Sequence, residues 1–172
     1  MADSVAIAEY LDSTYPNSLG GPLFPQGSRA AFAAFQASVA QALPPIFDLV
    51  VPAVHRILNP ASQQYFRTTR EARYGMKLEE VAPLGSARRE ELWRKTQEGL
   101  DQIAKFYEKD GKDKLWFLGD TFSFADAYFA GYLAWIMAVL GADSEEWKRL
   151  VSWNEGRWAR LVDATADLRT EP

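Results

Sequence analysis

The sequence has 172 residues, of which 48% are apolar and 24% charged, and this composition is typical of one globular domain with a substantial core. Its formal net charge of −4, without a block of basic residues, argues against a nucleic-acid surface, which needs a clustered basic stripe. Because the chain has no cysteine and one histidine, it excludes disulfides, thiolate nucleophiles and sulfur-ligated or multi-histidine metal sites, and we expect no metal.

Residues 1–27 predict one short helix followed by an irregular linker. Ser4 is a candidate N-cap, and apolar residues follow it at helical spacing. Prolines and glycines between residues 16 and 25 then prevent the helix from continuing. The first residues lack the basic and apolar regions of a secretory signal, which favours a cytoplasmic location.

Residues 28–58 predict a longer helix that proline interrupts. Phe32, Phe35 and Val39 recur three or four residues apart, as on one face of a helix. Proline inside a helix costs about 3 kcal/mol, because it removes a donor and clashes with the preceding turn. The prolines that follow therefore predict a kink or a break near Leu43.

Residues 59–85 form the polar centre of the chain. Arg67 and Glu71 have the i,i+4 spacing of a helical ion pair, which contributes only ~0.2–0.5 kcal/mol, and two further arginines follow. A solvated helix explains this stretch. The alternative is an anion-recognising or gating segment over a pocket, because arginine binds carboxylates through two parallel hydrogen bonds. In that alternative, Tyr65 and Arg67 are contacts at the pocket rim.

The most informative stretch is 119–140. Ser123, followed three residues later by Asp126, has the pattern of a capping box, so a helix should begin there. No charge follows until residue 143, and a helix that is apolar all round is buried. The run is shorter than the roughly 20 residues that a bilayer crossing needs, so we expect a core helix and no membrane span. One face carries Phe124, Tyr128, Gly131, Trp135 and Val139, and the other carries Phe129, Leu133, Ile136 and Leu140.

The remaining segments are helical as well. Residues 86–110 predict another long helix, and capping-box patterns at 143–146 and 152–155 predict two short helices that close the domain. The sequence contains no β-rich segment, internal repeat or glycine-rich phosphate loop. The predicted fold class is therefore all-α.

Three motifs resemble those of the glutathione transferases. Residues 119–126, reading G-D-T-F-S-F-A-D, resemble the G-D-x-x-S-x-A-D box that opens the central helix of their C-terminal domain. The acid-serine pair at 3–4 and the Leu-Phe-Pro at 23–25 resemble the family's interdomain junction. The string Y-F-R-x-T-R-E, with Y-G-M-x-L-E-E after it, is similar to the β-etherase-like glutathione transferases of fungi and bacteria.

The resemblance implies a helical bundle of the glutathione transferase C-terminal domain type over residues 28–172. Residues 1–27 would be a junction helix and linker, the remnant of a thioredoxin-like half whose other elements are absent from this sequence. In the family, those elements carry the thiol-activating residue and the cis-proline. The resemblance therefore assigns no catalytic residue to this sequence. The resemblance also implies that Asp3 and Ser4 hold the γ-glutamyl end of glutathione. Alternatively, Ser4 only caps a helix and Asp3 only favours its dipole.

Three functions remain open on this evidence. The chain is the hydrophobic-substrate half of a protein that conjugates glutathione to hydrophobic small molecules or cleaves aryl ethers with it. Alternatively, it binds or converts an apolar or aromatic ligand without glutathione, or it is a helical protein-interaction module. We also expect a homo-oligomer, because a missing half would leave apolar surface exposed. The candidate substrate-binding residues, each of which could instead belong to the core, are Phe32, Phe35, Val39, Tyr65, Arg67, Tyr128, Tyr132 and Trp135.

Overall fold

The structure, a computed structural model, describes residues 4–16 and 21–169, and these residues form helices without a β-strand. The predicted all-α class is therefore confirmed. In chain order the described helices are α1 (Ser4–Thr14), α2 (Arg29–Ala42), α3 (Pro44–Val54), α4 (Pro60–Tyr74), α5 (Leu78–Val81), α6 (Ala87–Tyr107), α7 (Phe124–Leu140), α8 (Glu145–Ser152), the 3-10 turn η1 (Asn154–Gly156), α9 (Arg157–Ala164) and the 3-10 turn η2 (Ala166–Arg169).

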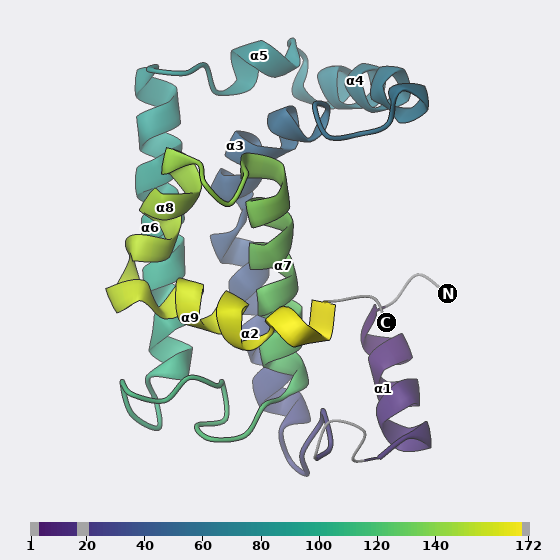
Figure 1. Cartoon of the computed structure of the whole chain (residues 1–172), viewed down its shortest axis with the longest axis vertical. Helices are drawn as coiled ribbons and strands as arrows, with labels where there is room; N and C mark the ends of the chain where they lie inside the picture. Colours follow the sequence, from purple (N-terminus) through teal and green to yellow (C-terminus); the bar gives the residue numbers. More distant parts are fainter. Residues whose placement is uncertain (1–3, 17–20, 170–172) are drawn as a thin grey trace.

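The long helices form the body of the molecule (Figure 1). Helices α2 and α3 pack on α6, and α7 packs against α2, α3, α8 and α9. The predicted break near Leu43 is confirmed, because α2 ends at Ala42 and α3 begins at Pro44 with a bend of 65° between them. Within the described ranges no single helix is long and apolar enough to cross a membrane, and only the bent pair α2 and α3 passes that test together.

The start of α7 is fixed by a buried carboxylate. Ser123 is the N-cap and forms the predicted capping box with Asp126, whose side chain is fully buried. The Asp126 carboxylate accepts hydrogen bonds from the amide and the hydroxyl of Ser123, both at 2.8 Å, and from the amide of Phe117 at 2.8 Å. Burial raises the pKa of Asp126 to about 6, and these hydrogen bonds oppose that rise. One side chain thus joins the loop before α7 to its first turn.

The two faces of α7 have different surroundings. Phe129, Leu133 and Ile136 are almost fully buried, as the sequence predicts. On the other face Val139 is buried, but Gly131 is exposed and Trp135 is only half-buried. The expectation that the helix is buried all round is therefore wrong for one face.

The C-terminal helices differ from the prediction in one place. Ser144 caps α8 by accepting a hydrogen bond from a backbone amide, but Ser152 ends that helix instead of capping the next one. Asn154 has a positive φ of 52°, and its amide side chain bonds Asp101 and the indole of Trp158, each at 2.7 Å. These side-chain bonds hold a tight turn where the sequence pattern predicted a capping box.

Helix α1 lies beside the lower end of the bundle in Figure 1. Its position depends on Asp12, whose carboxylate accepts hydrogen bonds from the amides of Leu23 at 2.6 Å and Phe24 at 3.2 Å. The Phe24 ring in turn packs on Phe32 and Phe124, with ring centroids 5.8 and 5.0 Å away. The linker thus anchors α1 to the first turns of α2 and α7.

Two helical glycines provide a matched test of this packing. A Cβ atom at Gly99 would lie 2.7 Å from the Ala42 carbonyl oxygen, whereas a Cβ at Gly131 would have no neighbour within 4 Å. We predict that Gly99→Ala lowers the free energy of unfolding by roughly 1–2 kcal/mol, because overpacking between α2 and α6 outweighs the gain in helix propensity. Gly131→Ala should raise it by about 0.5–1 kcal/mol. Urea denaturation measures both changes, and equal stabilisation by the two substitutions would contradict the close approach of α2 to α6.

Candidate functional site

A cleft of about 770 Å³ opens where the exposed face of α7 meets α3, α4 and the first residue of α1. We call it the aromatic cleft. Its lining consists of Ser4, Pro44, Phe47, Asp48, Val51, Arg70, Arg73, Tyr74, Tyr128, Gly131, Tyr132 and Trp135. Its volume lies in the usual range for small-molecule sites, which are mostly apolar with a few polar groups.

The floor of the aromatic cleft consists of Phe47, Tyr128, Tyr132 and Trp135. Tyr128 and Tyr132 lie one helical turn apart on α7, with ring centroids 5.2 Å apart and nearly perpendicular planes. Phe47 of α3 contacts both Tyr132 and Trp135, at centroid distances of 6.0 and 5.8 Å. These edge-to-face and tilted ring contacts fix the rings relative to one another, so a flat apolar ligand meets a preformed surface.

Tyr74 and Tyr128 at the cleft remain protonated at neutral pH, because their pKa values are raised. Burial, together with the hydrogen bond between the two hydroxyls at 3.4 Å, raises the pKa of Tyr128 to about 12. Burial and the neighbouring negative charge of Asp48 raise the pKa of Tyr74. Protonated phenols donate hydrogen bonds and do not act as bases, so they suit ligands that present an acceptor oxygen.

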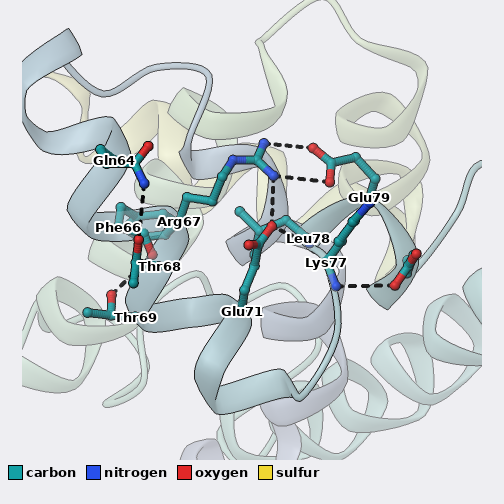
Figure 2. Close-up of polar contacts among 10 residues, drawn as sticks. Gln64, Phe66, Arg67, Thr68, Thr69, Glu71, Lys77, Leu78 and Glu79 are labelled. Carbon is teal, nitrogen blue, oxygen red and sulfur yellow. Dashed lines mark hydrogen bonds and ion pairs between the residues drawn. The ribbon is translucent and has the colours of Figure 1, made fainter.

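Helix α4 forms the outer wall of the cleft, and Arg67 attaches it to α5 (Figure 2). The helix has no buried residue and packs chiefly against α5. Arg67 donates to the two carboxylate oxygens of Glu79 at 2.7 and 3.2 Å, and to Glu71 at 2.8 Å. The hydrogen bonds from Arg67 lower the pKa of Glu79 to about 2, so the ion pair persists across the physiological range.

Arg70 and Arg73, unlike Arg67, line the aromatic cleft. Arg70 lies over the ring of Phe66 at 4.9 Å, and its guanidinium also contacts the Thr69 hydroxyl at 3.4 Å. Neither Arg70 nor Arg73 forms an ion pair within the part of the chain that the structure describes. The cleft therefore carries two cationic groups from α4 opposite its aromatic floor.

The structure brings four of the predicted site residues to one cleft. Ser4, Tyr128, Tyr132 and Trp135 line it, whereas Asp3 lies outside the described residues. The other predicted substrate contacts lie elsewhere. Phe32, Phe35 and Val39 are buried beneath α7, Tyr65 is 73% exposed, and Arg67 lines a smaller cavity on the α5 side.

Sequence reasoning did not select the other lining residues as site residues, namely Pro44, Phe47, Asp48, Val51, Arg70, Arg73, Tyr74 and Gly131. A usable signal existed for α3: after the break at Leu43, positions 44, 47, 48 and 51 follow the helical period, as one face of α3 would. For metals, no group of three or more His, Asp or Glu side chains in the described ranges is placed to hold an ion.

Comparison with known proteins gives consistent matches. The family model described as "Glutathione S-transferase, C-terminal domain" matches residues 30–168. The curated "Glutathione S-transferase-like protein ustS" of Aspergillus flavus is 29% identical over 182 residues, covering 96% of this chain and 59% of that protein.

Solved structures of fungal transferases superpose closely. Glutathione S-transferase CsGST63524 of Ceriporiopsis subvermispora, crystallised in complex with glutathione, is 42% identical with a TM-score of 0.86, covering 99% of this chain and 67% of that chain. Glutathione transferase GSTFuA3 from Phanerochaete chrysosporium is 41% identical with a TM-score of 0.86, covering 99% of this chain and 66% of that chain. The present chain thus spans less than two thirds of the curated relative and about two thirds of each solved transferase.

The attachment of α4 by Arg67 can be tested directly. We predict that Glu79→Gln increases the rate at which chymotrypsin cleaves after the aromatic residues of α4, because the helix loses the charged half of its link to α5. Glu91→Gln, which removes the exposed ion pairs of Glu91 with Arg94 and Lys95 within α6, is the matched control and should leave that rate unchanged. Raising the salt concentration should move the wild-type rate toward that of the variant. Equal cleavage rates for wild type and Glu79→Gln would show that the ion pair does not hold α4.

Proposed function

The chain belongs to the glutathione transferase family, and we propose that it supplies the part of such a protein that binds the hydrophobic substrate. The reaction class that we propose is glutathione-dependent conjugation, or aryl-ether cleavage, of hydrophobic or aromatic small molecules. One observation carries this proposal: Ser4, which the motif match assigns to glutathione, lines the same cleft as the aromatic floor. A thiol donor held at the start of α1 would therefore lie beside a ring bound on α7.

The chemistry of the cleft supports this assignment. Because Tyr128 stays protonated, its hydroxyl can donate a hydrogen bond to an acceptor oxygen such as that of an ether or carbonyl. Ser4 is exposed at the first residue of α1, where a helix start favours a carboxylate. Holding both reactants in one cleft contributes proximity to the reaction.

A second candidate function is binding of an aromatic ligand without glutathione. The size of the cleft and its preformed floor favour this function, since neither depends on a bound peptide. The two candidates make different predictions for the same ligands, so one experiment separates them.

A cytoplasmic location stays a prediction from the sequence.

A thermal-shift series with glutathione, S-hexylglutathione and a two-ring aryl ether tests the proposed function. A ligand at 100 times its dissociation constant stabilises the native state by about 2.7 kcal/mol, so we expect a higher melting temperature with S-hexylglutathione and with the ether. Ser4→Ala should reduce the shift caused by the glutathione derivatives but not the shift caused by the ether. Ser13→Ala, at the other end of α1, is the matched control, because that hydroxyl bonds only within its own helix.

The outcomes of this series discriminate between the candidates. A shift with the ether alone would favour the glutathione-independent binder. No shift with any of the three compounds would contradict both functions and leave the protein-interaction module.

We also propose that the chain self-associates, because α1 exposes large apolar side chains. Ile7, Tyr10 and Leu11 of α1 are 46%, 65% and 45% exposed, and Tyr15, just after the end of α1, is 61% exposed. Exposed apolar groups that cluster on one helix are typical of interaction surfaces. We predict a dimeric or larger mass by light scattering at micromolar concentration, and that Tyr10→Lys shifts the mass toward the monomer. A monomeric mass for the unchanged chain would contradict this proposal.

A further inference from the structure

We propose that the aromatic cleft selects aromatic molecules that carry an anionic group, with the ring on the floor of α7 and the anion held by Arg70 and Arg73 of α4. This inference rests on the proposed function, because it assumes that the cleft is the substrate site. It adds a charge requirement that the aromatic floor alone does not impose.

The first argument is how α4 uses its three arginines. Arg67, Arg70 and Arg73 follow one another at intervals of three residues, so each neighbours the next on the helix surface while Arg67 and Arg73 are about 120° apart around the helix. Arg67 is paired with two carboxylates and lies outside the cleft. Arg70 and Arg73 line the cleft and have no carboxylate partner among residues 4–16 and 21–169. Their charges are therefore available to a ligand.

The second argument is that Arg70 is held in place before a ligand binds. Its guanidinium lies 4.9 Å from the centre of the Phe66 ring, and its Nη1 is 3.4 Å from the Thr69 hydroxyl. The side chain is half-buried, so less rotamer freedom is lost on binding than for a fully mobile arginine. A guanidinium has five N–H donors, and most of them remain open to an anion.

The third argument is the charge balance of the lining. Asp48 is its one carboxylate among the described residues, and it lies beside the Tyr74 hydroxyl. No ion pair joins Asp48 to Arg70 or Arg73 in those residues, because Asp48 lies beside Tyr74 instead. The lining therefore carries two positive charges and one negative charge. An anionic ligand gains from this balance, and a cationic ligand would meet two like charges.

The fourth argument is the arrangement of the two groups. The arginines come from α4 and the rings from α7 and α3, so they form different walls of one cleft. A ligand with its aromatic system at one end and a carboxylate at the other can contact both walls at once. The chemical class is therefore an aryl carboxylate or a comparable aromatic anion.

The experiment compares two probes of the same shape, 2-naphthoate and the neutral 2-naphthamide, by calorimetric titration at neutral pH. We expect the carboxylate to bind roughly three- to tenfold more tightly, as for a charge-assisted contact in a partly exposed site. Rising salt should weaken binding of the carboxylate but not of the amide. Arg70→Ala and Arg73→Ala should each remove most of the preference and leave the affinity for the amide unchanged.

Two control variants make the result specific. Arg88→Ala removes an equal charge from the exposed start of α6, away from the cleft lining, and should keep the full preference. Arg73→Lys keeps the charge without the planar fork, so it should retain the salt dependence with reduced affinity. The melting temperature of each free variant checks that the fold is intact.

The inference and the proposed function fail in different ways. Equal binding of the two probes, or a preference that survives both Arg70→Ala and Arg73→Ala, would overturn the inference while the cleft remained an aromatic site. Absence of binding by either probe would overturn the proposed function, and the inference with it.

Discussion

The structure depends on one buried carboxylate. Asp126 has no exposed surface, and a charge in that position is costly unless hydrogen bonds compensate it. Three donors from Phe117 and Ser123 do so, and they come from both sides of the turn that leads into α7. The orientation of α7 about its axis follows from this attachment, and that orientation decides which residues enter the core and which face the cleft.

The rest of the site follows from the sequence period of α7. Because 3.6 residues make one turn, Phe129, Leu133 and Ile136 face the core while Tyr128 and Tyr132 face the other way. Packing in the core fixes the three buried side chains and with them the backbone of α7. The two tyrosines are attached to that same rigid backbone, although they are not fully buried themselves. The floor of the cleft is therefore rigid although it is open to solvent, which is the arrangement that favours ligand recognition.

The sequence predicted the helices well, because their signals are local. The capping box at Ser123 and the proline break near Leu43 each depend on a few neighbouring residues, and both predictions are confirmed. The turn at Asn154 was mispredicted, because its conformation depends on a bond to Asp101, more than fifty residues away. Local patterns cannot report such a contact.

The site was only partly accessible from the sequence for the same reason. Tyr128, Tyr132 and Trp135 were selected from the pattern of α7, and they reach the cleft together with Ser4. Phe35 satisfies the same apolar pattern but is fully buried, since the sequence gives the spacing of a face and not its surroundings. The aromatic cleft exists because α4 stands away from α7, and the position of α4 depends on tertiary contacts such as those of Arg67, in the middle of the helix, with α5.

The lack of buried side chains in α4 has a consequence for ligand exchange. Moving a helix away from a protein costs free energy in proportion to the apolar area that becomes exposed to water, and in α4 that area comes chiefly from the partly buried Phe66, which packs against the core. Its displacement would break the polar contacts of Arg67 and expose Phe66, whereas the fully buried core residues belong to other helices. A bulky ligand would then enter and leave the aromatic cleft by displacing α4, while the helices beneath α4 stay folded.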